Sequence, residues 1–172
     1  MHNLFKKRRS IRKFTPKEVD ESQIRDILSA AMVAPSANNL HPLDFIIVKD
    51  RKTLKKLSVC GPSQEFVKDA PMAIVVVADP VKSKRFWLID ATLAAAHIYL
   101  EVANQGLAAC WANIYQGTLK DGRDRESYVR EVLNIPINKN PVCILPIGYP
   151  AISVSEHNED EYEEDRIHSE NW

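Results

Sequence analysis

Glycine and cysteine are scarce in this sequence, with five glycines and three cysteines among 172 residues. The few glycines form no glycine-rich phosphate loop, so a dinucleotide is not predicted as a resident cofactor. Cys60, Cys110 and Cys143 lack CxxC spacing and lie in or near apolar runs, which predicts buried, reduced thiols and no disulfide framework. The five histidines form no HxxxH or similar pattern, so no metal site is predicted.

Long apolar runs and a net charge are also lacking. No run approaches the roughly 18 apolar residues that span a bilayer, and no apolar segment follows the basic N-terminus as in a secretory signal. Acidic residues and Lys plus Arg number 23 each, so bulk attraction to nucleic acid or to an anionic membrane is not expected. These features predict a cytoplasmic protein that binds neither nucleic acid nor membrane.

The balanced charge is unevenly distributed along the chain. Residues 1–17 carry seven Lys and Arg residues and no acid, whereas residues 156–165 carry seven acidic residues and no Lys or Arg. Arg8 and Arg12, with Ser10 between them, would suit a phosphate-bearing group, because a phosphate brings about two negative charges and attracts charge-assisted donors. The alternative is a solvated basic N-terminus, or a partner for the acidic tail.

Apolar periodicity predicts a helix near residues 19–34, which Pro35 ends because the residue before a proline is disfavoured in the helical region. A long helix is predicted over 85–104, apolar except for a narrow polar stripe, and therefore buried as a core helix or at a dimer interface. Further expected elements are strands at 45–48, 72–77, 107–114 and 142–147 and helices at 51–58 and 123–133. This order indicates one α+β or α/β sandwich domain.

The segment from Ala34 to Pro42 is a stiff loop between the first predicted helix and strand. Two prolines frame small residues and the side-chain amides of Asn38 and Asn39. Asparagine donates and accepts hydrogen bonds at once, which suits the polar edge of a flavin pyrimidine ring. An ordinary helix-to-strand turn rich in turn-forming residues is the alternative.

Five motifs together resemble the nitroreductase family. They are RRSIRKF, APSANNLHPLDFIIV, GLAACWANI, ILPIGYP and DRIHSENW, in the family's order across essentially the whole chain. The resemblance implies a single FMN-binding domain over 1–172, with a central, mainly antiparallel sheet of four to five strands flanked by helices. It further implies an intertwined homodimer with the long helix at the interface, and a C-terminal extension, 149–172, that packs on the partner subunit.

The resemblance also implies where FMN binds. Phosphate and pyrimidine contacts would come from Arg8, Arg9, Ser10 and Arg12, and partner-chain contacts from Pro35, Ser36 and Asn39. Backbone groups beside the reactive flavin nitrogen would come from Trp111, Ala112, Asn113 and Ile114, and a terminal contact from Arg166. Arg12 is the electrostatic candidate, since a fixed cation near the pyrimidine favours negative charge on the reduced ring. His41, where the family often has Gln, is expected to shape the acceptor pocket.

The implied activity is that of an FMN-dependent NAD(P)H oxidoreductase. Hydride would pass in a ping-pong scheme from NADH or NADPH to FMN, and then to a nitroaromatic, quinone or similar acceptor. Flavin-binding or flavin-consuming modules of the same fold without NAD(P)H turnover are the alternative, and an interaction domain with a docking tail is a third. Many family members have a Lys or Arg pair after the glycine-proline turn, which residues 151–165 lack. Weak FMN affinity is therefore expected.

Overall fold

An antiparallel five-stranded sheet forms the centre of the molecule in the computed structural model, which describes residues 1–61 and 63–172. The strand order is β1-β2-β5-β3, and β4 also pairs with β5. All four strand pairings are antiparallel. The strands are β1 (Leu43–Val48), β2 (Met72–Ala78), β3 (Ala108–Ala109), β4 (Ala112–Asn113) and β5 (Asn140–Gly148). The predicted α+β class is confirmed.

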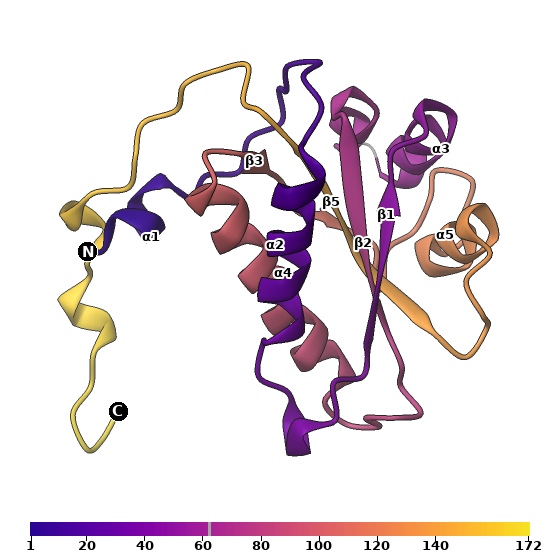
Figure 1. Cartoon of the computed structure of the whole chain (residues 1–172). Coiled ribbons are helices and arrows are strands. Elements are labelled where there is room, and N and C mark those ends of the chain that lie inside the picture. Colours follow the sequence, from indigo (N-terminus) through magenta and orange to yellow (C-terminus); the bar gives the residue numbers. More distant parts are fainter. Residues whose placement is uncertain (62) are drawn as a thin grey trace.

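Helices cover both faces of this sheet (Figure 1). On one face lie α2 (Glu21–Met32) and α4 (Trp87–Asn104), and on the other lie α3 (Arg51–Leu57) and α5 (Arg125–Leu133). Every residue of β2 is buried, because its alternate side chains enter the two separate cores. A short N-terminal helix, α1 (Asn3–Lys7), packs against α4 and was not predicted.

Local signals explain where the main helices begin and end. Asp20 and Gln23 form a capping box at the start of α2, which satisfies backbone N–H groups that have no partner within the helix. Gly106, with φ of +70°, follows the C-cap of α4 in the left-handed conformation that glycine adopts at least cost.

The strand predicted over 107–114 is interrupted, and the prediction was wrong on this point. Both β3 and β4 pair with β5 in one continuous register, which would place Cys110 opposite Pro146. Proline has no N–H to donate, so this rung of the ladder cannot be completed. The chain is therefore regular on either side of Cys110–Trp111 and irregular between.

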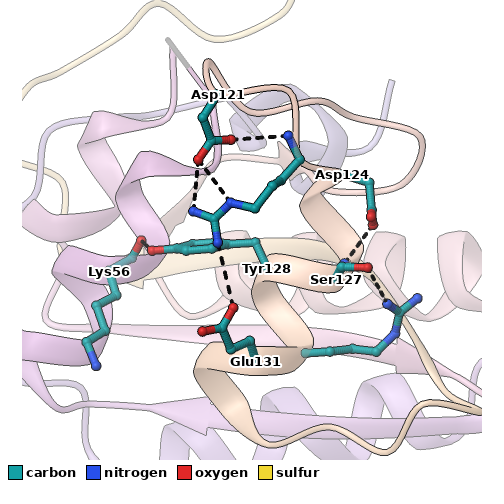
Figure 2. Close-up of polar contacts among 8 residues, drawn as sticks. Lys56, Asp121, Asp124, Ser127, Tyr128 and Glu131 are labelled. Atoms are coloured by element: carbon teal, nitrogen blue, oxygen red, sulfur yellow. Dashed lines mark hydrogen bonds and ion pairs between the residues drawn. The ribbon is translucent and has the colours of Figure 1, made fainter.

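The chain beyond β4 is fixed by polar contacts at the start of α5 (Figure 2). Asp124 caps this helix by accepting a hydrogen bond from the Ser127 N–H at 2.7 Å. The Tyr128 hydroxyl donates to the Lys56 carbonyl at 3.0 Å and so ties α5 to α3. The Arg123 guanidinium lies over the Tyr128 ring, 5.2 Å from its centroid.

All three cysteines are free and buried, as the sequence predicts. Within the described ranges, no helix combines the length and apolar character that crossing a membrane requires.

Candidate functional site

The basic N-terminal segment runs beside the edge of the sheet. Ser10 forms a bridge with Ala109, and the Ile11 N–H donates to the Ala109 carbonyl at 3.0 Å. Further along, the Ala151 N–H donates to the Lys13 carbonyl at 2.9 Å. Three of the five sequence motifs, those around residues 8–14, 106–114 and 144–150, thus meet at one place in the fold.

The four predicted contacts on this segment have different surroundings. Arg8 is half-buried, with its guanidinium 5.9 Å from the centroid of the Tyr99 ring. The Arg9 guanidinium donates to a tail carbonyl, and Arg12 lies 5.6 Å from the centroid of Phe66. Ser10 is exposed. Several cationic donors therefore lie along one edge, as an anion-binding role requires.

Behind this edge lie two protonated side chains, Tyr99 and Cys110. Tyr99 is 9% exposed, and its hydroxyl has no hydrogen-bond partner among the described residues. Burial raises the pKa of the Tyr99 hydroxyl above its ordinary value. Burial also raises the pKa of the Cys110 thiol, against a smaller opposing effect of the Arg12 charge. Neither group is ionised near neutral pH, so neither supplies a ready nucleophile or base.

The stretch from Trp111 to Ile114 presents mainly backbone. Ala112 and Ile114 are buried, Trp111 is half-buried and Asn113 is exposed. The Ile114 N–H donates to the Val142 carbonyl at 3.1 Å and holds the stretch against β5. A ligand at this position would meet the Trp111 and Asn113 side chains and the backbone.

Gln64 holds this stretch through a hydrogen bond and is not among the residues predicted from the sequence. Its side chain is buried, and its Nε2 donates to the Asn113 carbonyl at 2.8 Å. Arg125 Nη1 donates to the same oxygen at 3.0 Å. Gln64 Oε1 has no partner among the described residues. The glutamine lies before an irregular 3-10 segment, Glu65–Asp69, where no periodicity marks it out.

The proline-framed loop adopts a constrained conformation. Asn38, Asn39 and His41 have φ values of +51°, +55° and +44°, in the left-handed region that non-glycine residues rarely occupy. The Ser36 hydroxyl accepts from the His41 N–H at 2.9 Å, and His41 Nε2 lies 2.7 Å from Asn39 Oδ1.

A buried carboxylate anchors this loop to α4. Asp90 is 2% exposed and accepts from the Ala37 N–H at 2.9 Å and from the Ser83 hydroxyl at 3.2 Å. Asp90 lies on the narrow polar stripe of the helix predicted over 85–104, and nothing in the local sequence pattern indicates its partners.

Within one chain the loop and the N-terminal arginines lie toward opposite ends of α4 (Figure 1). The loop is held at Asp90, whereas Arg8 lies over Tyr99. Nine residues of helix separate these positions by about 13 Å along its axis. Pro35, Ser36, Asn39 and His41 are therefore not brought together with Arg8, Arg9, Ser10 and Arg12 by the fold of a single chain.

The acidic tail folds back toward α1. Glu159 pairs with Lys6 at 3.1 Å and with the N-terminal amine at 2.7 Å. Arg166, predicted as a terminal cofactor contact, pairs with Glu163 at 2.7 Å and is 77% exposed. Pairing between the basic N-terminus and the acidic tail therefore occurs, through Lys6 and the terminal amine.

Comparisons with known proteins agree on the family. The model of the nitroreductase family matches residues 5–59 and 58–149. A Methanothermobacter thermautotrophicus protein named NADH dehydrogenase/NAD(P)H nitroreductase is 39% identical over 169 residues, covering 97% of this chain and 85% of its own length. The solved structure of an FMN-dependent nitroreductase from Clostridium difficile has a TM-score of 0.96 at 36% identity, with both chains fully covered. An iodotyrosine deiodinase of Thermotoga neapolitana is 26% identical over 175 residues, covering 87% of this chain and 88% of that protein. The chain belongs to the nitroreductase family.

Proposed function

We propose that this protein is an FMN-dependent oxidoreductase that takes electrons from NADH or NADPH and passes them to a nitroaromatic, quinone or similar acceptor. One observation carries the proposal. The donors of Arg8, Arg9, Ser10 and Arg12 lie along the edge that leads to the stretch 111–114, and buried polar atoms without described partners lie behind it.

The residues at this edge fit FMN. Guanidinium and hydroxyl donors at 8–10 match a phosphate, and Arg12 adds a positive charge nearer the stretch 111–114. Two buried groups behind this edge, Gln64 Oε1 and the Tyr99 hydroxyl, have no hydrogen-bond partner among the described residues, so unused hydrogen-bonding capacity lies beside the site. FMN, when bound, supplies the capacity to accept and release hydride.

The protein's own residues then have three tasks. Arg8, Arg9 and Arg12 would hold the phosphate and stabilise negative charge, with Arg12 as the candidate for electrostatic stabilisation of the reduced ring. The stretch 111–114, supported by Gln64 and Arg125, forms one wall of the site. Burial raises the pKa values of Tyr99 and Cys110, so neither of these two groups is an activated nucleophile. A donor and then an acceptor would occupy the same open space, in a ping-pong order.

A second copy of the chain would complete this site. The outer face of α4 exposes apolar side chains, with Ile89 56% and Leu93 37% exposed, and Met32 and Val33 add further apolar surface at the end of α2. Burial of such a face against another copy is favourable. A homodimer in which the partner's loop supplies Pro35, Ser36 and Asn39 accounts for the separation of that loop from Arg8. We extend the proposal to this dimer and place His41 beside the acceptor. We further propose a cytoplasmic location.

Reconstitution tests the proposed function. The purified protein is mixed with FMN, freed of excess, and titrated anaerobically with NADH and then with NADPH while the absorbance is recorded. We expect bound flavin bands that bleach with a nicotinamide and return when a quinone is added. Bands that persist with both donors would favour a flavin-binding module, and a protein that binds no FMN would overturn the proposal.

A further inference from the structure

His157 connects the acidic tail to one of the predicted phosphate-binding arginines. The Arg8 Nη2 atom lies 3.0 Å from His157 Nε2, and His157 Nδ1 lies 2.6 and 2.7 Å from the two carboxylate oxygens of Glu161. Arginine offers donors only, so Nε2 accepts here and the proton resides on Nδ1, which donates to Glu161. The imidazole is therefore neutral in this arrangement, and its acceptor nitrogen, Nε2, points toward Arg8.

The histidine is held in place by the backbone as well as by its ring. Its N–H donates to the Lys6 carbonyl at 2.9 Å, and the Arg9 guanidinium donates to the Ser155 carbonyl. The His157 side chain is 21% exposed in a tail whose residues from 151 onward are otherwise exposed. This part of the tail is thus docked on residues 6–9 through a specific set of contacts.

Charged groups of both signs lie around the imidazole. Glu161 favours a second proton on the ring, and its own pKa is lowered by the hydrogen bond from His157. Arg8, Arg9 and Lys6 oppose that proton, with the Lys6 charge partly neutralised by Glu159. The N-terminal amine, also paired with Glu159, adds to the opposition. An added negative charge beside the ring would favour the second proton.

We propose that His157 is a phosphate-binding residue for FMN and that it takes up a proton from the buffer when FMN binds at Arg8. A phosphate brings about two negative charges to the guanidinium that the ring now faces, which turns Nε2 from an acceptor into a favourable donor position. The Glu161 carboxylate already lies at hydrogen-bond distance from the opposite ring nitrogen, Nδ1, and its negative charge stabilises the imidazolium. His157 thereby supplies a cationic donor in a stretch, 151–165, that contains no Lys or Arg. This inference rests on the proposed FMN-binding function.

Proton uptake can be measured directly by isothermal titration calorimetry at pH 7.5 in two buffers of different ionisation enthalpy. FMN phosphate is largely dianionic at this pH, because its second pKa is about 6. Free histidine is largely neutral there, with an ordinary pKa of about 6.5. We expect uptake of about half a proton or more with FMN, and none with riboflavin, which has the same ring system and no phosphate.

Matched variants assign the proton. In His157→Gln, uptake should disappear and the dissociation constant for FMN should rise about tenfold, the effect of losing one charge-assisted hydrogen bond. Riboflavin affinity should not change. Glu161→Gln should reduce the uptake while leaving Nε2 available. His168→Gln is the control, because His168 is an exposed tail histidine whose ring lies 4.4 Å from that of Trp172.

The outcomes separate this inference from the function on which it rests. Binding of FMN without proton uptake, at an affinity that His157→Gln leaves unchanged, overturns the role of His157 and leaves the flavoprotein assignment standing. Failure of the wild-type protein to bind either flavin overturns both.

Discussion

Replacing Asp90 with alanine is expected to loosen the proline-framed loop and to lower the stability of the whole chain. The buried carboxylate accepts one hydrogen bond from the loop, at the Ala37 N–H, and one from Ser83. The loop it holds contains Asn38 and Asn39 in the left-handed region. Such a conformation persists only where surrounding contacts maintain it.

The size of the effect follows from these contacts. Loss of the acceptor leaves the partly buried Ala37 N–H without its partner, at a cost of about 1–3 kcal/mol. The Ser83 hydroxyl loses a longer bond and can turn elsewhere. We therefore expect Asp90→Ala to lower the free energy of unfolding by about 2 kcal/mol. Asp90→Asn keeps an acceptor for the N–H and should cost about 1 kcal/mol, while Ser83→Ala should cost less than either alanine or asparagine at 90.

Urea unfolding of the flavin-free protein, followed by circular dichroism, measures these differences. All variants must be compared at one protomer concentration, because association would add to apparent stability. The dissociation constant for FMN gives the second reading. It should rise in Asp90→Ala and recover largely in Asp90→Asn, since the loop carries Pro35, Ser36 and Asn39. Unfolding of Asp90→Ala within about 0.5 kcal/mol of wild type would refute the reasoning.

Three substitutions and the reactivity of one cysteine test other parts of the molecule. Arg12→Ala should lower the reduction potential of bound flavin through loss of a fixed positive charge, and an unchanged potential measured by dye equilibration would exclude that role. Gly148→Ala would place a Cβ 2.5 Å from Pro71 Cδ and should cost about 1–3 kcal/mol in chemical unfolding. Burial raises the pKa of Cys60 from 9.0 to about 12, so the native thiol should resist maleimide at pH 8. Because only the unfolded chain then ionises this thiol, its contribution to stability should decline as the pH rises above 9. Ile89→Glu should shift the protein toward monomer in analytical ultracentrifugation, and an unchanged mass would contradict burial of that face.

The long, periodic elements could be predicted from the sequence because their patterns reflect burial directly. Two-sided burial makes β2 a continuous run of apolar residues, and α2 begins after its N-cap Asp20 and ends at Met32, shortly before Pro35. The break between β3 and β4 was not predicted, since it arises from Pro146 on another strand. Because proline has no N–H for strand pairing, Pro146 predicts a break at Cys110, but only when the register that places the two residues opposite each other is known.

The candidate site was predictable only in part for a similar reason. The motifs identify the segment 8–12 and the stretch 111–114, and the fold brings these together. The supporting residues Gln64, Asp90 and His157 act through partners 49, 53 and 149 positions away in the sequence. No local period or cap encodes such contacts, and each of these side chains has an ordinary alternative as a loop, helix or tail residue.

Helix α4 shows what a periodic pattern can and cannot determine. Its polar stripe would ordinarily face water, yet Asp90 is turned onto the loop and His97 Nδ1 lies 3.0 Å from the Ala30 carbonyl of α2. The stripe is therefore used within the chain, beside the apolar residues of α4 that enter the core, and Ile89 and Leu93 remain exposed on the outer side. Periodicity identifies two faces of a helix but not which face points inward. Core packing of the buried apolar residues, with the two hydrogen bonds to the backbone of residues 30 and 37, fixes the orientation of α4 and leaves Ile89 and Leu93 on a surface that a second copy of the chain would cover.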